Sequence, residues 1–284
     1  MSTPPLAITG STGVLGSKVA ALLSAAGAAQ RLLARNPERA PHLAGATAVA
    51  CSYGDAAAAA SALEGIEVLF MVSAAESADR LEQHFTFVDA ARDAGVQHIV
   101  YTSFQRAAPD SIFTLARDHY ATEEHIKASG MRWTMLRDSL YLDFLPALVG
   151  EDGVIRGPAG TGRVAAVARD DIARVAARVL LDPAAHDGAT YTLTGSEALT
   201  LDEVAGVVAR ETGRPVTFYD ETIDEAYASR AKWNAPDWQN DAWVSTYTAI
   251  ARGEFAEVTT DIFDITGVPP LTLADFLRRT PATG

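Results

Sequence analysis

Near its start the chain reads Leu6-Ala7-Ile8-Thr9-Gly10-Ser11-Thr12-Gly13-Val14-Leu15-Gly16. Leu6 to Ile8 are apolar and partly β-branched, which is typical of a buried parallel strand. Three glycines follow at three-residue spacing, and the strong helix former Lys18 to Ala26 comes after them. A strand, a glycine turn and a helix in this order predict a loop that binds the pyrophosphate of a dinucleotide.

Each glycine of the loop has a separate predicted role. Gly10 allows the tight turn, Gly13 lets the backbone approach a pyrophosphate, and Gly16 lets the helix pack closely on the strand. The amino end of the helix then offers free N–H groups and a positive dipole to the phosphates. We therefore predict cofactor contacts along the whole loop, from Gly10, Ser11, Thr12, Gly13, Val14, Leu15 and Gly16.

The end of the second expected strand, Gln30 to Ala34, indicates which dinucleotide binds. About 20 residues past the glycines, NAD enzymes carry Asp or Glu for the ribose 2′-hydroxyl, whereas NADP enzymes use Arg for the 2′-phosphate. Here the position holds Arg35, with Arg39 close behind. This predicts NADPH as the cofactor; the alternative is that Arg35 is a solvated surface side chain.

Strands and helices continue to alternate in the first half of the chain. Further strands are expected over Ala46 to Cys51, Glu67 to Ala74, His98 to Phe104 and Arg132 to Leu136. Helices are expected over Ala56 to Leu63, Ala78 to Ala94 and Ile112 to Ser129. Repeated β–α units predict an α/β fold, a doubly wound parallel sheet of the Rossmann type.

The second half changes character, which suggests a smaller C-terminal substrate lobe. We expect one NAD(P)-binding domain over 1–284, with a Rossmann core at about 1–139 plus 163–195 and the lobe at about 140–162 plus 196–284. A short strand is expected over Val164 to Val167, and Asp170-Asp171 should cap a helix that runs to Leu181. Thr200, with Glu203 three residues on, predicts a capping box.

Composition excludes several classes of partner. The net charge of −13 disfavours DNA, RNA and anionic membranes, whose phosphates would be repelled. The single cysteine, Cys51, rules out an internal disulfide and favours a reducing compartment. No signal peptide is recognisable, and the longest apolar run, Val68 to Val72, is too short to span a membrane. We expect a cytoplasmic monomer or homodimer.

Candidate substrate residues follow the strands at the edge where ligands bind in open α/β sheets. The small residues Ser73, Ala74 and Ala75 lie at the carboxyl end of the fourth expected strand, Glu67 to Ala74, and Phe104 ends the fifth, His98 to Phe104. Tyr141 and Phe144 follow strand six and would complete an aromatic wall for a flat acceptor. Trp233 and Trp238 either roof the same pocket or pack in a core or subunit interface.

Nearly the whole chain resembles the NmrA-like branch of the atypical short-chain dehydrogenase/reductases, particularly its NADPH-dependent quinone oxidoreductases and triphenylmethane-dye reductase. The matching pieces are Thr9 to Gly16, Leu33 to Glu38, Ala94 to Phe104, Asp118 to Glu123, Thr134 to Arg137, Ala168 to Ala173 and Gly267 to Leu277. The resemblance implies that the glycine loop and Arg35 hold the ADP phosphates and that Ser73 to Ala75 line the nicotinamide.

The resemblance also implies a second cofactor segment after strand six. Arg137, Asp138 and Ser139 would wrap the cofactor, and Arg169 would lie near it. Relatives typically read Arg-Asn-Gly here, so this chain departs from them by an aspartate and a serine.

No tyrosine carries the lysine that carbonyl-reducing members of the superfamily use to lower its pKa. The residues four positions after Tyr101, Tyr120, Tyr141, Tyr227 and Tyr247 are Gln105, Glu124, Leu145, Ala231 and Ala251. Quinones do not need this acid, because they accept hydride readily and the product protonates from water.

We take His119 and Tyr141 as candidate catalytic residues. His119 has Glu123 one helical turn on, which suits a proton relay; the alternative is a structural hydrogen-bonding histidine. No further ligand is suitably spaced for a metal, so none is predicted.

The sequence leaves two classes of function open. One is an NADPH-dependent oxidoreductase that transfers hydride to a quinone or similar conjugated acceptor, or to a secondary-metabolite intermediate. The other is a non-catalytic NADP-binding redox sensor that regulates a protein partner.

Overall fold

The computed structural model describes residues 5–279, and the chain forms two compact units. Unit 1 comprises Met1–Phe104, Asp118–Arg137 and Ile172–Tyr191, and unit 2 comprises Gln105–Arg117, Asp138–Asp171 and Thr192–Gly284. Within the described residues, no helix is long and apolar enough to cross a membrane.

Unit 1 is built on a seven-stranded sheet in the order β3-β2-β1-β4-β5-β6-β9. The strands are β1 (Leu6–Ile8), β2 (Gln30–Ala34), β3 (Ala46–Ala50), β4 (Val68–Met71), β5 (His98–Phe104), β6 (Arg132–Asp138) and β9 (Ala189–Leu193). The pairings from β3 to β5 are all parallel, with Leu6 opposite both Gln30 and Val68. Their carboxyl ends therefore share one edge, which carries the glycine loop after β1, Arg35 after β2 and the loop after β4.

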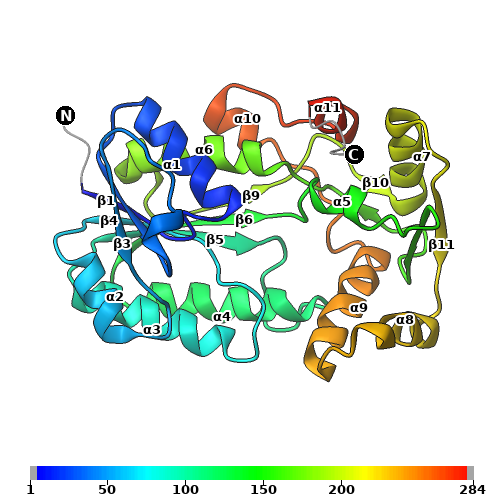
Figure 1. Ribbon diagram of the computed structural model, residues 1–284, viewed down its shortest axis with the longest axis horizontal. Helices are drawn as coiled ribbons and strands as arrows, with labels where there is room; N and C mark the ends of the chain where they lie inside the picture. The colour runs from blue at the N-terminus through cyan, green and yellow to red at the C-terminus, as the bar shows by residue number, and fades with distance from the viewer. Residues whose placement is uncertain (1–4, 280–284) are drawn as a thin grey trace. The chain divides into compact units, whose positions relative to one another are not determined.

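Helices cover both faces of this sheet (Figure 1). They are α1 (Val14–Ala25), α2 (Ala56–Leu63), α3 (Arg80–Asp93), α4 (Thr114–Ala128) and α6 (Arg169–Leu181). Figure 1 shows α1 and α6 on one face and α2, α3 and α4 on the other. The core on the second face joins buried Leu69, Phe87, Ile99 and Met135, and it includes the buried Cys51.

The Rossmann-type doubly wound sheet expected from the sequence is confirmed, with differences at several element ends. Helix α1 begins at Val14, four residues before the expected start, because the last turn of the glycine loop is already helical. Strand β4 ends at Met71, so Ser73 to Ala75 lie in a loop, and α3 begins only at Arg80. Strand β8 covers Arg163–Val164 rather than Val164 to Val167.

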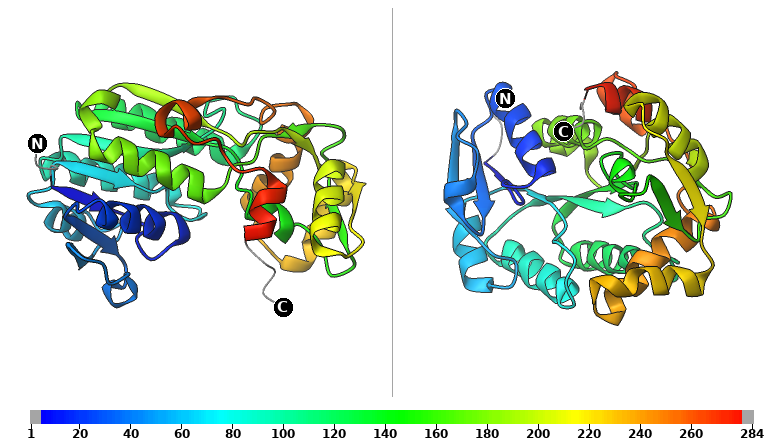
Figure 2. Two further views of the ribbon diagram at one scale, coloured as in Figure 1. Left: turned by 90° about the horizontal axis from the view of Figure 1, so that it is seen from above. Right: turned by 45° about the vertical axis from the view of Figure 1, so that its right-hand side comes forward.

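Unit 2 combines short strands with helices. Strand β7 (Val154–Gly157) pairs in parallel with β11 (Thr217–Asp220), and β8 (Arg163–Val164) pairs antiparallel with β10 (Leu199–Thr200). The helices are α5 (Phe144–Ala147), α7 (Leu201–Thr212), α8 (Ile223–Arg230), α9 (Asp237–Ala251), α10 (Asp261–Thr266) and α11 (Leu273–Arg279). Helix α11 lies against α7, and α8 lies against α9 (Figure 2).

Two local expectations for the second half have different outcomes. Thr200 and Glu203 form the expected capping box at the start of α7. Asp170 and Asp171, expected as helix caps, instead lie within the first turn of α6, which begins at Arg169. The Asp171 carboxylate accepts a hydrogen bond from the Leu271 backbone N–H at 2.8 Å, and this distant partner explains its burial.

The segment 105–117, which we expected in the Rossmann core, groups with unit 2. The Ile112 backbone N–H donates to both oxygens of the Glu254 carboxylate at 3.2 Å. The Thr114 N–H donates to the Ser245 hydroxyl at 3.2 Å. These contacts explain the grouping, since they tie the segment to residues more than 100 positions away.

Candidate functional site

The glycine loop leaves no room for a side chain at Gly10 or Gly16. Gly10 has a φ of +60°, and a Cβ there would lie 3.1 Å from the Cβ of Val72. A Cβ on Gly16 would lie 2.3 Å from the Gly10 carbonyl oxygen, so the first turn of α1 rests directly on the loop. Gly13 is the helix N-cap and supplies no side-chain cap, so the first N–H groups of α1 stay available to an anion.

The other loop residues divide into anchors and exposed positions. The Ser11 hydroxyl is buried and donates to the Leu33 carbonyl at 3.0 Å, which ties the loop to β2. Leu15 packs in the core, whereas Thr12 and Val14 are exposed beside Gly13. This exposed backbone, at a helix amino end, has the chemistry of a phosphate site.

Arg35 lies exposed immediately after β2. Among the residues that the structure describes, it makes no ion pair. Its guanidinium is thus available to an anionic group at the carboxyl edge of the sheet.

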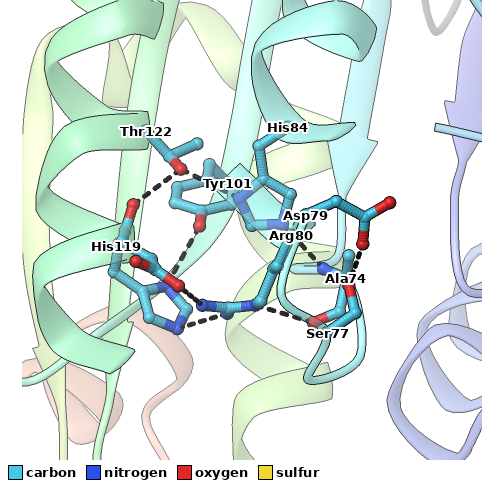
Figure 3. Close-up of polar contacts among 9 residues, drawn as sticks. Ala74, Ser77, Asp79, Arg80, His84, Tyr101, His119 and Thr122 are labelled. Carbon is cyan, nitrogen blue, oxygen red and sulfur yellow. Dashed lines mark hydrogen bonds and ion pairs between the residues drawn. The ribbon is translucent and has the colours of Figure 1, made fainter. Parts of the chain in front are cut away.

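The loop after β4 is held through its backbone by three buried side chains of unit 1. The Ser73 N–H donates to Thr102 Oγ1 at 2.8 Å. The Ala74 N–H donates to His84 Nε2 at 2.9 Å, and the Ala74 carbonyl accepts from Arg80 Nε at 3.0 Å (Figure 3). Ser73 and Ala74 are half-buried and Ala75 is exposed, so the loop is anchored from beneath.

His119 belongs to the same buried network (Figure 3). Its Nε2 lies 2.9 Å from Arg80 Nη2, and its Nδ1 lies 3.0 Å from the Tyr101 hydroxyl. Because an arginine can only donate, Nε2 is the acceptor and Nδ1 carries the proton. Burial, reinforced by the Arg80 charge, lowers the pKa of His119 well below 6.5. The geometry therefore favours the hydrogen-bonding role over proton donation.

Arg80 is the centre of this network. Its side chain is 4% exposed, and Nη1 lies 3.2 Å from Asp118 Oδ2. Together with Ala74 and His119, this makes three different acceptors for one guanidinium. His84 is likewise buried, and burial followed by the Arg80 charge lowers its pKa to about 3. Both imidazoles are thus neutral at pH 7.

Glu123 does not join His119, contrary to the relay that the i+4 spacing suggests. Its fully buried carboxylate accepts from the Ser103 hydroxyl at 2.5 Å and from Arg137 at 2.8 and 2.6 Å. Hydrogen bonding to Glu123 raises the pKa of Arg137 above the ordinary value for arginine. The Arg137 side chain is therefore committed to α4, although it was predicted to contact the cofactor.

Unit 2 brings Asp138, Tyr141 and Arg169 together. The Tyr141 hydroxyl donates to Asp138 Oδ2 at 3.0 Å, and the Arg169 guanidinium carbon lies 4.7 Å from the centre of the Tyr141 ring. Burial raises the pKa of Asp138 well above 3.8, which favours the neutral acid. A neutral acid does not repel phosphates, so the aspartate in place of the relatives' asparagine is compatible with an anionic cofactor. Ser139 is also buried.

The predicted aromatic residues are distributed over both units. Phe104, in unit 1, is 8% exposed, and its ring centre lies 5.9 Å from that of His119. In unit 2, Phe144 is 43% exposed and Trp238 is half-buried. Trp233 is 57% exposed and meets Trp243 edge-on at 5.7 Å, so it contacts a neighbouring helix rather than a core.

Metal-ligating side chains and the Cys51 thiol were further candidates for chemistry. Within residues 5–279, no group of three or more His, Cys, Asp or Glu side chains could hold a metal ion. Burial, together with the Asp55 charge, raises the pKa of the Cys51 thiol to about 11, which removes its nucleophilic form at neutral pH.

Sequence reasoning missed the role of Arg80, His84 and Thr102. Arg80 and His84 are one helical turn apart at the start of α3, so they lie on one face of that helix. That spacing, on the first helix after a strand whose end faces the ligand edge, was the only available signal.

Comparisons with known proteins agree on one family. The model of the NmrA-like family matches residues 2–230. Quinone oxidoreductase 2 of Escherichia coli is 36% identical over 278 residues, which cover 95% of this chain and 96% of that protein. The NAD(P)H azoreductase of Xenophilus azovorans is 30% identical over 277 residues, with 95% and 96% covered.

Solved structures give the same result. The NADPH complex of the quinone oxidoreductase QOR2 from Escherichia coli has a TM-score of 0.88 and 34% identity, and covers 96% of this chain and 99% of its own. The triphenylmethane reductase of Citrobacter sp. has a TM-score of 0.84 and 30% identity, with 97% and 98% covered.

Proposed function

The chain belongs to the NmrA-like family and is an NAD(P)H-dependent oxidoreductase, and we propose that it transfers a hydride from NADPH to quinones or similar conjugated acceptors. The observation that carries this proposal is the 36% identity to quinone oxidoreductase 2 across 95% of the chain, in a sequence without the Tyr-x-x-x-Lys pair. Carbonyl reduction needs that acid, whereas quinone reduction does not.

In this proposal the cofactor lies along the carboxyl edge of the unit 1 sheet. The backbone around Gly13 receives the pyrophosphate, and Arg35 receives the 2′-phosphate. In unit 1, Ser73 to Ala75 line the nicotinamide; Asp138, Ser139 and Arg169 are the cofactor candidates of unit 2. NADPH, when bound, supplies the hydride. The chain's own residues bind and orient the cofactor and place a flat acceptor next to the nicotinamide.

The acceptor site is proposed to use aromatic side chains. The candidates are Phe104 in unit 1 and Tyr141 and Phe144 in unit 2, with Trp233 and Trp238 as further candidates in unit 2. Tyr141 remains the candidate for direct contact with the acceptor, since its hydroxyl is fixed on Asp138 and its ring carries the Arg169 cation on one face.

The reductase proposal is tested with an acceptor panel. Steady-state NADPH oxidation is measured with benzoquinones, naphthoquinones and cationic triphenylmethane dyes. We expect turnover with at least one acceptor. Phe104→Ala and Tyr141→Ala should raise the acceptor KM, because each removes a stacking surface, while the Kd for NADPH stays within about twofold. Tight NADPH binding with no turnover on any acceptor would instead favour the redox-sensor function.

Arg35 is expected to determine cofactor preference. A charge-assisted contact to the 2′-phosphate contributes roughly 1.5–3 kcal/mol, so Arg35→Ala should reduce the preference for NADPH over NADH by about 10- to 100-fold. Dissociation constants for both cofactors measure this.

Arg132→Ala is the matched control for Arg35. It also removes one exposed positive charge, but Arg132 starts β6, and its N–H donates to the Gln97 carbonyl at the amino edge of the sheet. The control should keep the wild-type preference. An unchanged preference in Arg35→Ala would contradict the assignment of the 2′-phosphate position.

A further inference from the structure

We propose that three buried side chains, Thr102, His84 and Arg80, are positioning residues that fix the backbone of Ser73 and Ala74 for the nicotinamide. We call these three the loop clamp. This inference rests on the proposed function, which assigns Ser73 to Ala75 to the nicotinamide side of the cofactor.

The loop clamp satisfies three backbone groups of two successive residues. It accepts from the Ser73 N–H at 2.8 Å, accepts from the Ala74 N–H at 2.9 Å, and donates to the Ala74 carbonyl at 3.0 Å. The Ala74 N–H belongs to the Ser73–Ala74 peptide and the Ala74 carbonyl to the Ala74–Ala75 peptide, so the peptide planes on both sides of Ala74 are held. The clamp members are 0% to 4% exposed, so water does not compete for these bonds.

The contacts of His84 define which of its ring nitrogens carries the proton. His84 Nε2 accepts from Ala74, so its Nδ1 carries the proton and donates to Thr122 Oγ1 at 2.9 Å (Figure 3). Thr122 in turn donates to the Asp118 carbonyl at 2.8 Å. The ring therefore has a near side, which holds the loop, and a far side, which only holds the ring.

The two sides can be separated by substitution. Gln in place of His84 has an amide oxygen near the position of Nε2, which retains an acceptor for the Ala74 N–H. Asn in the same place puts its amide near Nδ1, which retains the Thr122 contact and loses the loop. The two variants have similar polarity and differ in which side survives.

We expect His84→Asn to weaken NADPH binding by about tenfold, which is the loss of one buried hydrogen bond and of the ordered loop. His84→Gln should bind NADPH within about twofold of wild type. Both should lower the thermal unfolding midpoint, because each loses one buried contact. Titration of the fluorescence of bound NADPH gives the Kd, and a thermal scan gives the midpoint.

Two isosteric threonine variants make the same test by another route. Thr102→Val removes the acceptor of the Ser73 N–H. Thr122→Val removes the far-side partner of His84 and the hydrogen bond to the Asp118 carbonyl, but leaves all three loop contacts in place; both threonines are at most 1% exposed. We expect the first to weaken NADPH binding by about tenfold and the second to leave it unchanged. This pair decides the matter if His84→Asn does not fold.

Equal NADPH affinity within both pairs would overturn the clamp and leave the reductase intact. Equal weakening within both pairs would also overturn it, because it would indicate a general structural effect. Failure of the wild-type chain to bind NADPH would reject the proposed function itself, so the two failures are distinguishable.

Discussion

Gly16→Ala is expected to weaken NADPH binding by more than about 100-fold, equivalent to roughly 3 kcal/mol. The added Cβ would lie 2.3 Å from the Gly10 carbonyl oxygen, 2.6 Å from the Gly10 carbonyl carbon and 2.8 Å from the Thr9 oxygen. All three are backbone atoms, so no rotamer change relieves the contact. Either α1 or the loop must move, and both carry the N–H groups assigned to the pyrophosphate. Titration with NADPH measures the effect.

The same substitution should lower the free energy of unfolding by about 3 kcal/mol, in the upper part of the range for overpacked interiors. Gly206→Ala is the matched control. Gly206 lies within α7, where a Cβ would meet only the far end of the Arg210 side chain at 3.8 Å. It should stabilise unit 2 by about 0.5–1 kcal/mol and leave NADPH binding unchanged. Near-wild-type NADPH affinity in Gly16→Ala would contradict the loop assignment.

Arg80→Met is expected to lower the free energy of unfolding by about 3 kcal/mol. The methionine fills similar space but leaves the Ala74 carbonyl and His119 Nε2 without their donor, at roughly 1–3 kcal/mol for each buried acceptor. The loss of the Asp118 ion pair adds little, because that carboxylate is 29% exposed and can be hydrated. Chemical denaturation monitored by circular dichroism measures the change.

Arg92→Met is the control on the same helix. Arg92 makes ion pairs with Asp89 and Asp93, but its side chain is 46% exposed. Its removal should change the unfolding free energy by less than about 0.5 kcal/mol. Equal losses of unfolding free energy in Arg80→Met and Arg92→Met would contradict a stabilising role for the buried network.

The fold was predictable because its signals are local. Leu6 to Ile8, the glycine spacing and the following helix former lie within about twenty residues, and each agrees with the others. The capping box at Thr200 was predictable for the same reason, since both partners lie within one turn.

Side-chain partners were much less predictable, because they come from distant parts of the chain. Glu123 was paired with His119 by helical spacing, yet its hydrogen-bond partners are Ser103 on β5 and Arg137 on β6, and Lys127 on its own helix lies 3.8 Å away. Arg80 reaches His119, which lies 39 residues later. No periodicity carries such pairings; only the packing of α3 and α4 against one sheet face creates them.

The state of Cys51 has a chemical consequence for the acceptors proposed above. Thiolates add to quinones by conjugate addition, and this reaction would inactivate an enzyme that carries a reactive thiolate. With a pKa of about 11, only about one Cys51 in 10,000 is ionised at pH 7, and its side chain is 8% exposed. Because it is the single cysteine of the sequence, the folded chain offers the proposed acceptors no reactive thiolate at neutral pH.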